Sequence, residues 1–314
     1  MNINRCNVDS WKNDIEESVN FYNRWFLDYA PKTFIEARKK ALKDVRCVFK
    51  HLKGAPDFQP LILNSVYPVL LVMRQMTCPP LARDRLAGLA NVKTSFIQRL
   101  EEKPMANNAW NNIKSPEVLS VIQKLLDNEL FSWLTEGSMP VSFRRQKMAE
   151  QIVADRLCGA LTDPLIRNEQ EKRQLNSIAS WLEHKGYHLV KASSYEALNP
   201  GEFAFHLTIK ASLAEKQEAT VGIPVDVAIQ PLKPKSDNFP IIIEAKSAGD
   251  FTNVNKRRKE EAQKVTQLKR TFGQVDYVLF LCGYFDTSFL GYEAAEGLDW
   301  IWEHRIDDMG KLGL

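Results

Sequence analysis

The chain has 314 residues, of which 44% are hydrophobic and 26% charged, and these proportions are typical of a globular protein with a sizeable core. Its formal net charge of +3 excludes a polycation that binds nucleic acid over its whole surface, so any nucleic-acid site must gather positive charge in one region. The five cysteines form no CxxC pair, which argues against a disulfide framework and a zinc site and favours a reducing compartment. The N-terminus has no apolar signal core, and the longest apolar run, 61–76, is interrupted by polar residues. We therefore expect a cytoplasmic protein with no membrane partner.

The first half of the chain is predicted to be helical. Apolar residues recur at helical spacing from Trp11 to Leu52, and Pro31 predicts a break between two helices there. Gly186 predicts the end of the last helix before the chain changes character. The remaining helices are predicted over 62–76, 80–101, 116–134, 143–160 and 165–185. We expect their apolar stripes to be packing surfaces.

The second half alternates between strand-like and helical segments. Strands are predicted over 203–209, 221–229, 240–246 and 276–282. A basic helix is predicted over 255–271 and a packing helix with an acidic outer face over 292–308. The order predicts an α/β (α+β) fold, in which a mixed central sheet with flanking helices follows a mostly helical N-terminal domain. We place the boundary near 140, with one domain at 1–140 and a second domain at 141–314.

Two predicted strands bear charged residues that alternation separates from their apolar faces. The odd-numbered valines and isoleucines of 221–229 are expected to share one face, so that Asp226 points to the other. Glu244 and Lys246 are two residues apart and share a face of 240–246. If the strands are neighbours, two carboxylates and one lysine meet, and a divalent cation is the natural reason to gather them. Mg²⁺ would be held by Asp226 and Glu244, with Lys246 beside the attacking water or the phosphate.

The Glu-x-Lys pattern by itself is weak, because the chain contains three copies of it. Glu101-x-Lys103 and Glu183-x-Lys185 lie in helical surroundings, where such charges are ordinary solvated surface. Only Glu244-x-Lys246 ends a strand-like run. Its alternative interpretation is a partly buried ion pair at the end of a sheet.

Glu171 is a fourth candidate for the same site. It continues the apolar stripe of the helix at 165–185 toward the N-terminus of that helix, from which it could reach the metal. The alternative is a carboxylate that only interacts with the helix dipole in the first turn. The sequence leaves both interpretations open.

A basic segment directly follows the predicted metal strand. It is expected to contact the phosphates of double-stranded DNA, although a solvated helix face is the alternative. The residues that we expect to contact DNA are Asn255, Lys256, Arg257, Arg258, Lys259 and Lys264.

These residues resemble a known family. The spaced motif Pro224-Val-Asp226 followed by Glu244-Ala-Lys246 resembles the PD-(D/E)xK nuclease signature, although Val225 separates the proline from the aspartate. The stretches 243–264, 277–286 and 291–308, with 77–90 and 159–175, are similar to type II restriction endonucleases of the XamI kind. The resemblance therefore covers most of the chain.

The resemblance implies a Mg²⁺-dependent type II restriction endonuclease that leaves 5′-phosphates, with a PD-(D/E)xK-like nuclease domain at 141–314. The helical domain at 1–140 is then expected to serve DNA recognition, dimerisation or both. Asp226 and Glu244 would match the metal ligands, Lys246 the catalytic lysine, and Glu171 a helical glutamate that some members add. It further implies a homodimer on a short palindrome, a GTCGAC-like site, and a cognate DNA methyltransferase as the functional partner. Two alternatives stay open: a nuclease of the same type without sequence specificity or with structure specificity, and a non-catalytic DNA-binding protein.

Overall fold

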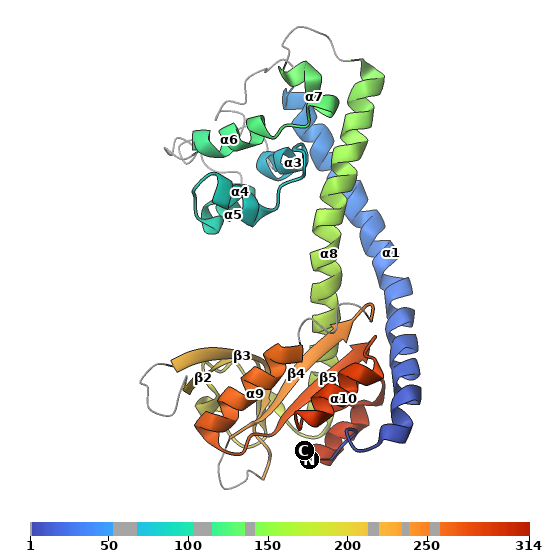
Figure 1. Ribbon diagram of the computed structural model, residues 1–314, viewed down its shortest axis with the longest axis vertical. Coiled ribbons are helices and arrows are strands. Elements are labelled where there is room, and N and C mark those ends of the chain that lie inside the picture. Colours follow the sequence, from blue (N-terminus) through green and yellow to red (C-terminus); the bar gives the residue numbers. More distant parts are fainter. Residues whose placement is uncertain are drawn as a thin grey trace. The chain divides into compact units, whose positions relative to one another are not determined.

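The computed structural model of the chain (Figure 1) describes residues 2–52, 68–102, 115–135, 142–212, 220–233, 239–251 and 258–314. The chain divides into two compact units: Met1–Tyr29 together with Arg167–Leu314 form the first, and Ala30–Ile166 form the second. The boundary predicted near residue 140 does not coincide with either limit of these units, which fall after Tyr29 and after Ile166. Which part reads DNA and which part cuts it stays a prediction.

Two long helices contribute to both units. They are α1 (Trp11–Leu52) and α8 (Phe143–His184), and each contains one internal proline, Pro31 and Pro164. The predicted break at Pro31 is therefore wrong, and the two helices predicted at 143–160 and 165–185 are one. An internal proline costs a helix about 3 kcal/mol. Burial of apolar residues on both sides of each proline, from Trp11 to Phe49 and from Ala149 to Leu182, offsets that cost.

The second unit is helical in its described part. Between α1 and α8 it contains α3 (Val69–Gln75), α4 (Arg83–Leu89), α5 (Thr94–Glu102), α6 (Ser115–Lys124) and α7 (Asn128–Thr135). The helices predicted at 80–101 and 116–134 are thus each a pair of shorter ones. Their apolar faces form one core, which confirms the packing role expected of them. Glu101 is buried there and pairs with Arg74 and Arg83, so the expectation that it is solvated surface is wrong.

The first unit is built on a mixed sheet of six strands in the order β1-β2-β3-β4-β5-β6. The neighbours β2–β3 and β3–β4 are antiparallel, and the other three pairs are parallel. This confirms the predicted mixed sheet. The strands are β1 (His188–Leu189), β2 (Glu202–Ser212), β3 (Thr220–Ile229), β4 (Ile241–Ala248), β5 (Tyr277–Gly283) and β6 (Asp299–Trp302).

A core lies on each face of this sheet. The α8-side core joins the strands to Leu175, Ile178 and Leu182 of α8. The α9-side core joins them to α9 (Arg258–Phe272) and α10 (Thr287–Ala295), which lie together over one face in Figure 1. Both faces are therefore covered, and polar groups between them need partners inside the protein.

The C-terminal segment differs from the prediction of one packing helix over 292–308. The chain instead leaves α10, forms β6, and ends in the 3₁₀ segment η4 (Glu303–Leu312). Two further 3₁₀ turns are η1 (Val8–Ser10) and η2 (Tyr195–Ala197). Within the described residues, no helix is long and apolar enough to cross a membrane.

Candidate active site

The candidate site lies where β3 and β4 separate. The ladder between these strands runs from Ile229↔Ile241 to Val227↔Ile243. The next rung would pair Asp226 with Glu244, but there the carboxylate of Asp226 reaches across instead, and its Oδ2 accepts a hydrogen bond from the backbone N of Ala245 at 2.8 Å. We call this point the β3–β4 fork, defined by Asp226, Glu244 and Ala245. The side chain of Asp226 thus satisfies a backbone donor that the ladder no longer uses.

In β2 and in β3, the apolar side chains change from one face of the sheet to the other at the level of the fork. In β3, Val225 packs in the α9-side core and Val227 in the α8-side core, so the prediction that residues 221–229 share one apolar face is wrong. Phe203 and Leu207 of β2 are divided between the two cores in the same way. His206 lies between them with φ 55°, a left-handed conformation that breaks the alternation of an extended strand.

Glu244 is buried at the fork and only half satisfied. Its Oε1 accepts a hydrogen bond from Nζ of Lys264 at 2.6 Å, whereas its buried Oε2 has no hydrogen-bond partner among the described residues. Burial, followed by repulsion from the carboxylates of Asp226 and Glu261, raises the pKa of Glu244 to about 7, although Lys264 opposes the shift. Such a carboxylate has an oxygen free for a ligand and is stabilised by any cation that reaches it.

Lys246 is held on the other side of the same cluster. Its Nζ lies 2.8 Å from Oε1 of Glu261 and 4.0 Å from Oε1 of Glu244. The hydroxyl of Tyr277 donates a hydrogen bond of 2.7 Å to Oε2 of Glu261. Burial raises the pKa of Glu261, but the ammonium of Lys246, the Tyr277 hydroxyl and Lys264 outweigh it and hold that pKa below its usual value.

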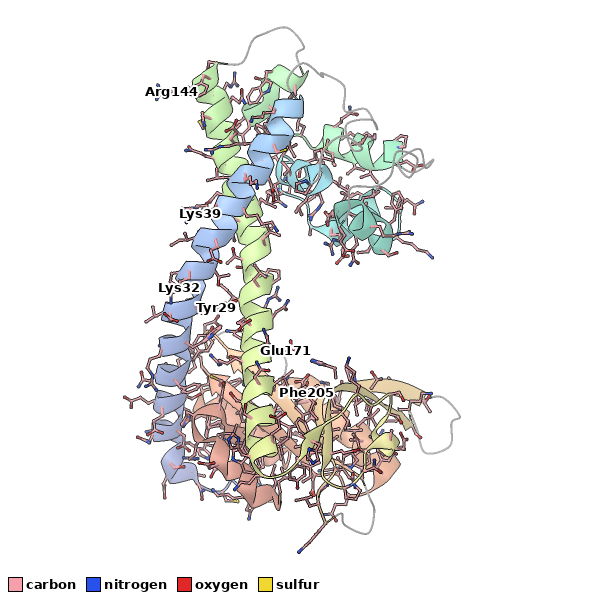
Figure 2. All side chains as sticks on the ribbon, turned by 180° about the vertical axis from the view of Figure 1, so that it is seen from behind. Tyr29, Lys32, Lys39, Arg144, Glu171 and Phe205 are labelled. Atoms are coloured by element: carbon pink, nitrogen blue, oxygen red, sulfur yellow. The ribbon has the colours of Figure 1, made fainter. Side chains whose placement is uncertain are left out.

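A second face of the fork is formed by α8 and β2. One ligand atom each from Glu171, His206 and Asp226 all lie within 4.8 Å of one another, and Nδ1 of His206 is 3.8 Å from Oε1 of Glu171. Figure 2 labels Glu171 on α8 and Phe205, the neighbour of His206 on β2. Of the two interpretations left open for Glu171, the structure places it beside Asp226.

The fork has the charge and the donors that a hard divalent cation needs. Asp226, Glu244 and Glu261 are three carboxylates, and in the described part of the chain the ammonium groups of Lys246 and Lys264 pair with Glu244 and Glu261. The Oε2 of Glu244, at the position opposite Asp226, is a buried oxygen that has no hydrogen-bond partner among the described residues. Carboxylate oxygens are the ligands that Mg²⁺ prefers, so the residues present fit the predicted ion.

The structure thus brings all four predicted site residues, Asp226, Glu244, Lys246 and Glu171, to one place, while their roles stay predictions. Of the predicted DNA contacts, Lys264 lies on α9 and its ammonium reaches Glu244. Arg258 and Lys259 begin α9, but their side chains lie outside the described part, as do Asn255, Lys256 and Arg257.

Three residues of the cluster were not predicted from the sequence: His206, Glu261 and Tyr277. His206 has no metal-ligand spacing to another histidine or to a cysteine along the chain, yet it stands opposite Asp226 between the rungs Phe205↔Val227 and Leu207↔Val225. Strand alternation places His206 off the apolar face, and that signal could have found it. Glu261 and Tyr277 show no comparable local signal, because their contacts depend on how α9 packs on β4 and β5.

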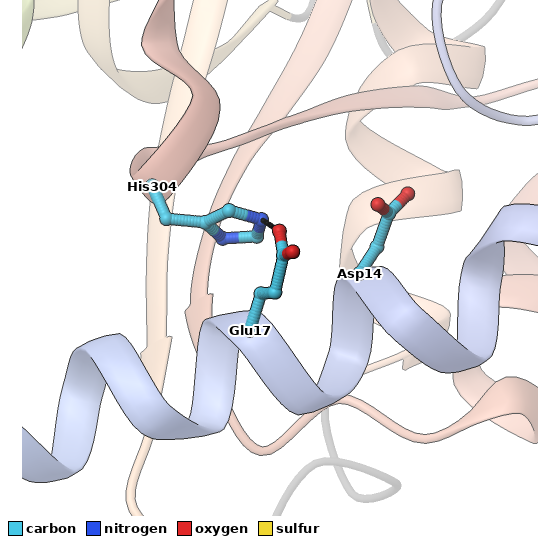
Figure 3. A group of neighbouring side chains, drawn as sticks. All are labelled: Asp14, Glu17 and His304. Atoms are coloured by element: carbon cyan, nitrogen blue, oxygen red, sulfur yellow. Dashed lines mark ion pairs between the residues drawn. The ribbon is translucent and has the colours of Figure 1, made fainter.

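A second group in the same unit combines Asp14 and Glu17 of α1 with His304 (Figure 3). Nε2 of His304 lies 3.3 Å from Oε2 of Glu17, and Asp14 is paired with Arg305 at 2.7 Å. Burial and the guanidinium of Arg305 favour the neutral imidazole, and the pKa of His304 is lowered. Since Arg305 already neutralises Asp14, we interpret this group as part of the ion-pair network that joins α1 to the C-terminal segment.

Comparisons with known proteins identify the family of the chain. The family model of the XamI restriction endonuclease matches residues 57–302. The type II restriction enzyme SalI of Streptomyces albus G is 42% identical over 318 residues, which cover 99% of this chain and 99% of that enzyme. The comparison with solved structures gave no significant match. The family predicted by resemblance is confirmed: the chain belongs to the XamI restriction endonuclease family.

Proposed function

We propose that the protein is a Mg²⁺-dependent, site-specific endonuclease that hydrolyses phosphodiester bonds of double-stranded DNA and leaves 5′-phosphates. In this proposal the sheet of the first unit is of the PD-(D/E)xK type, with Asp226 and Glu244 as metal ligands and Lys246 as the catalytic lysine. The observation that supports it most directly is the unpartnered Oε2 of Glu244 at the β3–β4 fork.

The side chains at the fork have different proposed roles. When bound, Mg²⁺ would stabilise the extra negative charge that develops on the phosphate during the reaction. Asp226 and Glu244 would hold the ion, and Glu171 and His206 lie beside Asp226 on the other face of the fork. Lys246 is paired with Glu261, so it acts as a positive charge and a hydrogen-bond donor toward the attacking water and the phosphate. The basic segment from Asn255 to Lys264 would hold the DNA backbone.

The whole candidate centre belongs to one unit of one chain. One copy therefore holds one set of these residues, and cutting both strands at one site calls for two copies. A homodimer on a short palindrome meets this requirement, because a two-fold protein matches a two-fold site. The cognate DNA methyltransferase would be its functional partner and would protect the same site.

The first test is digestion of a long unmethylated duplex with Mg²⁺, run beside EDTA and beside Glu244→Ala. We expect discrete fragments with 5′-phosphate ends, and no cleavage with EDTA or with Glu244→Ala. A matched control is Glu183→Ala, because Glu183 belongs to an exposed Glu-x-Lys pair at the end of α8 and is expected to cut normally.

Two results would support the alternatives. Metal-dependent degradation without discrete fragments indicates a nuclease that is not sequence-specific, or one that recognises DNA structure. Intact DNA in all lanes, with folded protein that binds DNA tightly, indicates a non-catalytic DNA-binding protein.

A further inference from the structure

A buried carboxylate on α9 contacts the lysine at the fork. Glu261 is 2% exposed, and both of its oxygens are engaged. Oε1 pairs with Nζ of Lys246 at 2.8 Å, and Oε2 accepts a hydrogen bond of 2.7 Å from the hydroxyl of Tyr277 on β5. The side chain of Lys246 thus extends from β4 to the fork, where Glu261 of α9 binds its ammonium group. Tyr277 in turn holds the Glu261 carboxylate in place.

The two lysines of the cluster are assigned to different carboxylates. Lys246 lies closer to Glu261 (2.8 Å) than to Glu244 (4.0 Å). Lys264 shows the opposite preference, with 2.6 Å to Glu244 and 3.7 Å to Glu261. Without Glu261, the flexible side chain of Lys246 would have Glu244 as its nearest carboxylate, and a lysine has enough rotamers to follow it.

Stability of the fold is a poor reason for this arrangement. β4 and β5 already pair along seven rungs, from Ile242↔Tyr277 to Ala248↔Gly283, and α9 packs on the sheet through Val265 and Leu268. Taking two charges out of water often cancels the attraction between them, so a buried ion pair adds little net stability. What the pair does add is a defined position for the Lys246 ammonium.

We propose that Glu261 is a positioning residue, which acts through Lys246 and is itself held by Tyr277. This inference rests on the proposed function, because it assigns Lys246 to catalysis. Glu261 sets the place of the Lys246 ammonium relative to the scissile phosphate and keeps that ammonium away from Glu244. DNA and metal are expected to bind without it, whereas the chemical step needs it.

The test compares Glu261→Gln and Tyr277→Phe with the unsubstituted protein in single-turnover cleavage with Mg²⁺. Gln keeps the size of the side chain but loses the charge, and we expect the rate constant to fall roughly 10- to 100-fold, as for a misplaced catalytic group. Phe removes one hydrogen bond to the Glu261 carboxylate but leaves the charge of Glu261 in place, so we expect a smaller fall of about 3- to 10-fold. DNA affinity measured with Ca²⁺ should change by less than about two-fold, since it does not depend on the place of the Lys246 ammonium. The rate constants are compared at saturating Mg²⁺, because a Lys246 that pairs with Glu244 also raises the Mg²⁺ concentration needed for half-maximal rate.

The amplitude of the reaction separates positioning from a structural role. A positioning role lowers the rate constant and leaves the fraction of DNA cut in one turnover unchanged, whereas misfolding lowers that fraction. Glu303→Gln is the matched control, because it breaks another buried ion pair, with Arg173 at 2.8 Å, and should cut at the normal rate.

Three outcomes would overturn the inference. They are an unchanged rate constant in Glu261→Gln, a loss of amplitude alone in both variants, and a rate constant of Glu261→Gln that saturating Mg²⁺ restores fully, which would make Glu261 a metal ligand. Glu244→Ala, measured in parallel, distinguishes this failure from failure of the proposed function. If Glu244→Ala is inactive and Glu261→Gln cuts at the normal rate, only the positioning role is wrong.

Discussion

The ionised form of Glu244 is costly to the folded protein. Its side chain is buried, one oxygen lacks a hydrogen-bond partner among the described residues, and two further carboxylates lie near it. A buried carboxylate of this kind is destabilised until a cation arrives, and Lys264 supplies only part of that compensation. We infer that the site trades stability of the metal-free protein for affinity toward the ion.

The raised pKa of Glu244 predicts a pH dependence of stability. The pKa is raised from 4.5 to about 7, so between these pH values the folded protein keeps a proton that the unfolded chain has released. Stability of the metal-free protein therefore falls as pH rises through this window and changes no further above it. Gln cannot ionise, so Glu244→Gln should gain relative stability across the window, to about 3 kcal/mol at pH ~8.

Urea unfolding in EDTA at several pH values measures this difference. A difference between the two proteins that stays constant from pH ~4.5 to pH ~8 would contradict the prediction, because Glu244 would then ionise normally. Saturating Mg²⁺ should stabilise the unsubstituted protein more than Glu244→Gln, since binding to the folded state adds to its stability.

At the scale of the element, the apolar side chains of β2 change from one face of the sheet to the other at a single residue. His206 has φ 55°, and the hydrophobic residues on its two sides pack in different cores. Glycine adopts a positive φ freely, whereas a β-branched residue is strongly disfavoured there. This change of face in β2 therefore requires a residue at position 206 that tolerates a positive φ, and it places the imidazole opposite Asp226.

We expect His206→Val to be less stable than His206→Gly by about 1–3 kcal/mol, because only glycine accepts the backbone conformation without strain. The free energy of unfolding of the two variants in urea measures the difference. Thr208→Val and Thr208→Gly, on an exposed position of the same strand that pairs regularly with Pro224, are the control pair. There valine should be the more stable, and the same order at both positions would show that no left-handed residue is needed at 206.

At the scale of the whole molecule, each chain holds one candidate centre, and all of it lies in the first unit. If two copies act on one palindrome, each cuts one strand. Dimers that contain one unsubstituted chain and one Glu244→Ala chain should then nick circular DNA without linearising it. Mixing the two proteins in varied ratios and separating nicked from linear plasmid measures this. If linear DNA falls in proportion to the active protein and no nicked DNA accumulates, one chain cuts both strands.

Local patterns in the sequence were sufficient for part of this description. Alternation of apolar residues predicted β3, because residues two apart in a strand share a face, and a short apolar run that ends in charge predicted β4. Asp226, Glu244 and Lys246 were identified because they interrupt or end those patterns. Helical spacing likewise predicted most helices of the first half. Pro31 predicted a break that packing of α1 overrides.

Contacts between distant residues required the tertiary structure. Asp299 accepts hydrogen bonds from the backbone N of Ile3, Asn4 and Arg5, about 295 residues away, and this anchors β6 where a helix was predicted. Glu261 and Tyr277 join the cluster at the β3–β4 fork only because α9 packs over β4 and β5. By itself the sequence determined the local elements and the three charged residues that interrupt or end their patterns, since periodicity and charge are properties of neighbouring residues. Only tertiary packing decided which partners satisfy those charges, because burial makes every unpaired polar group costly and the partners come from any part of the chain.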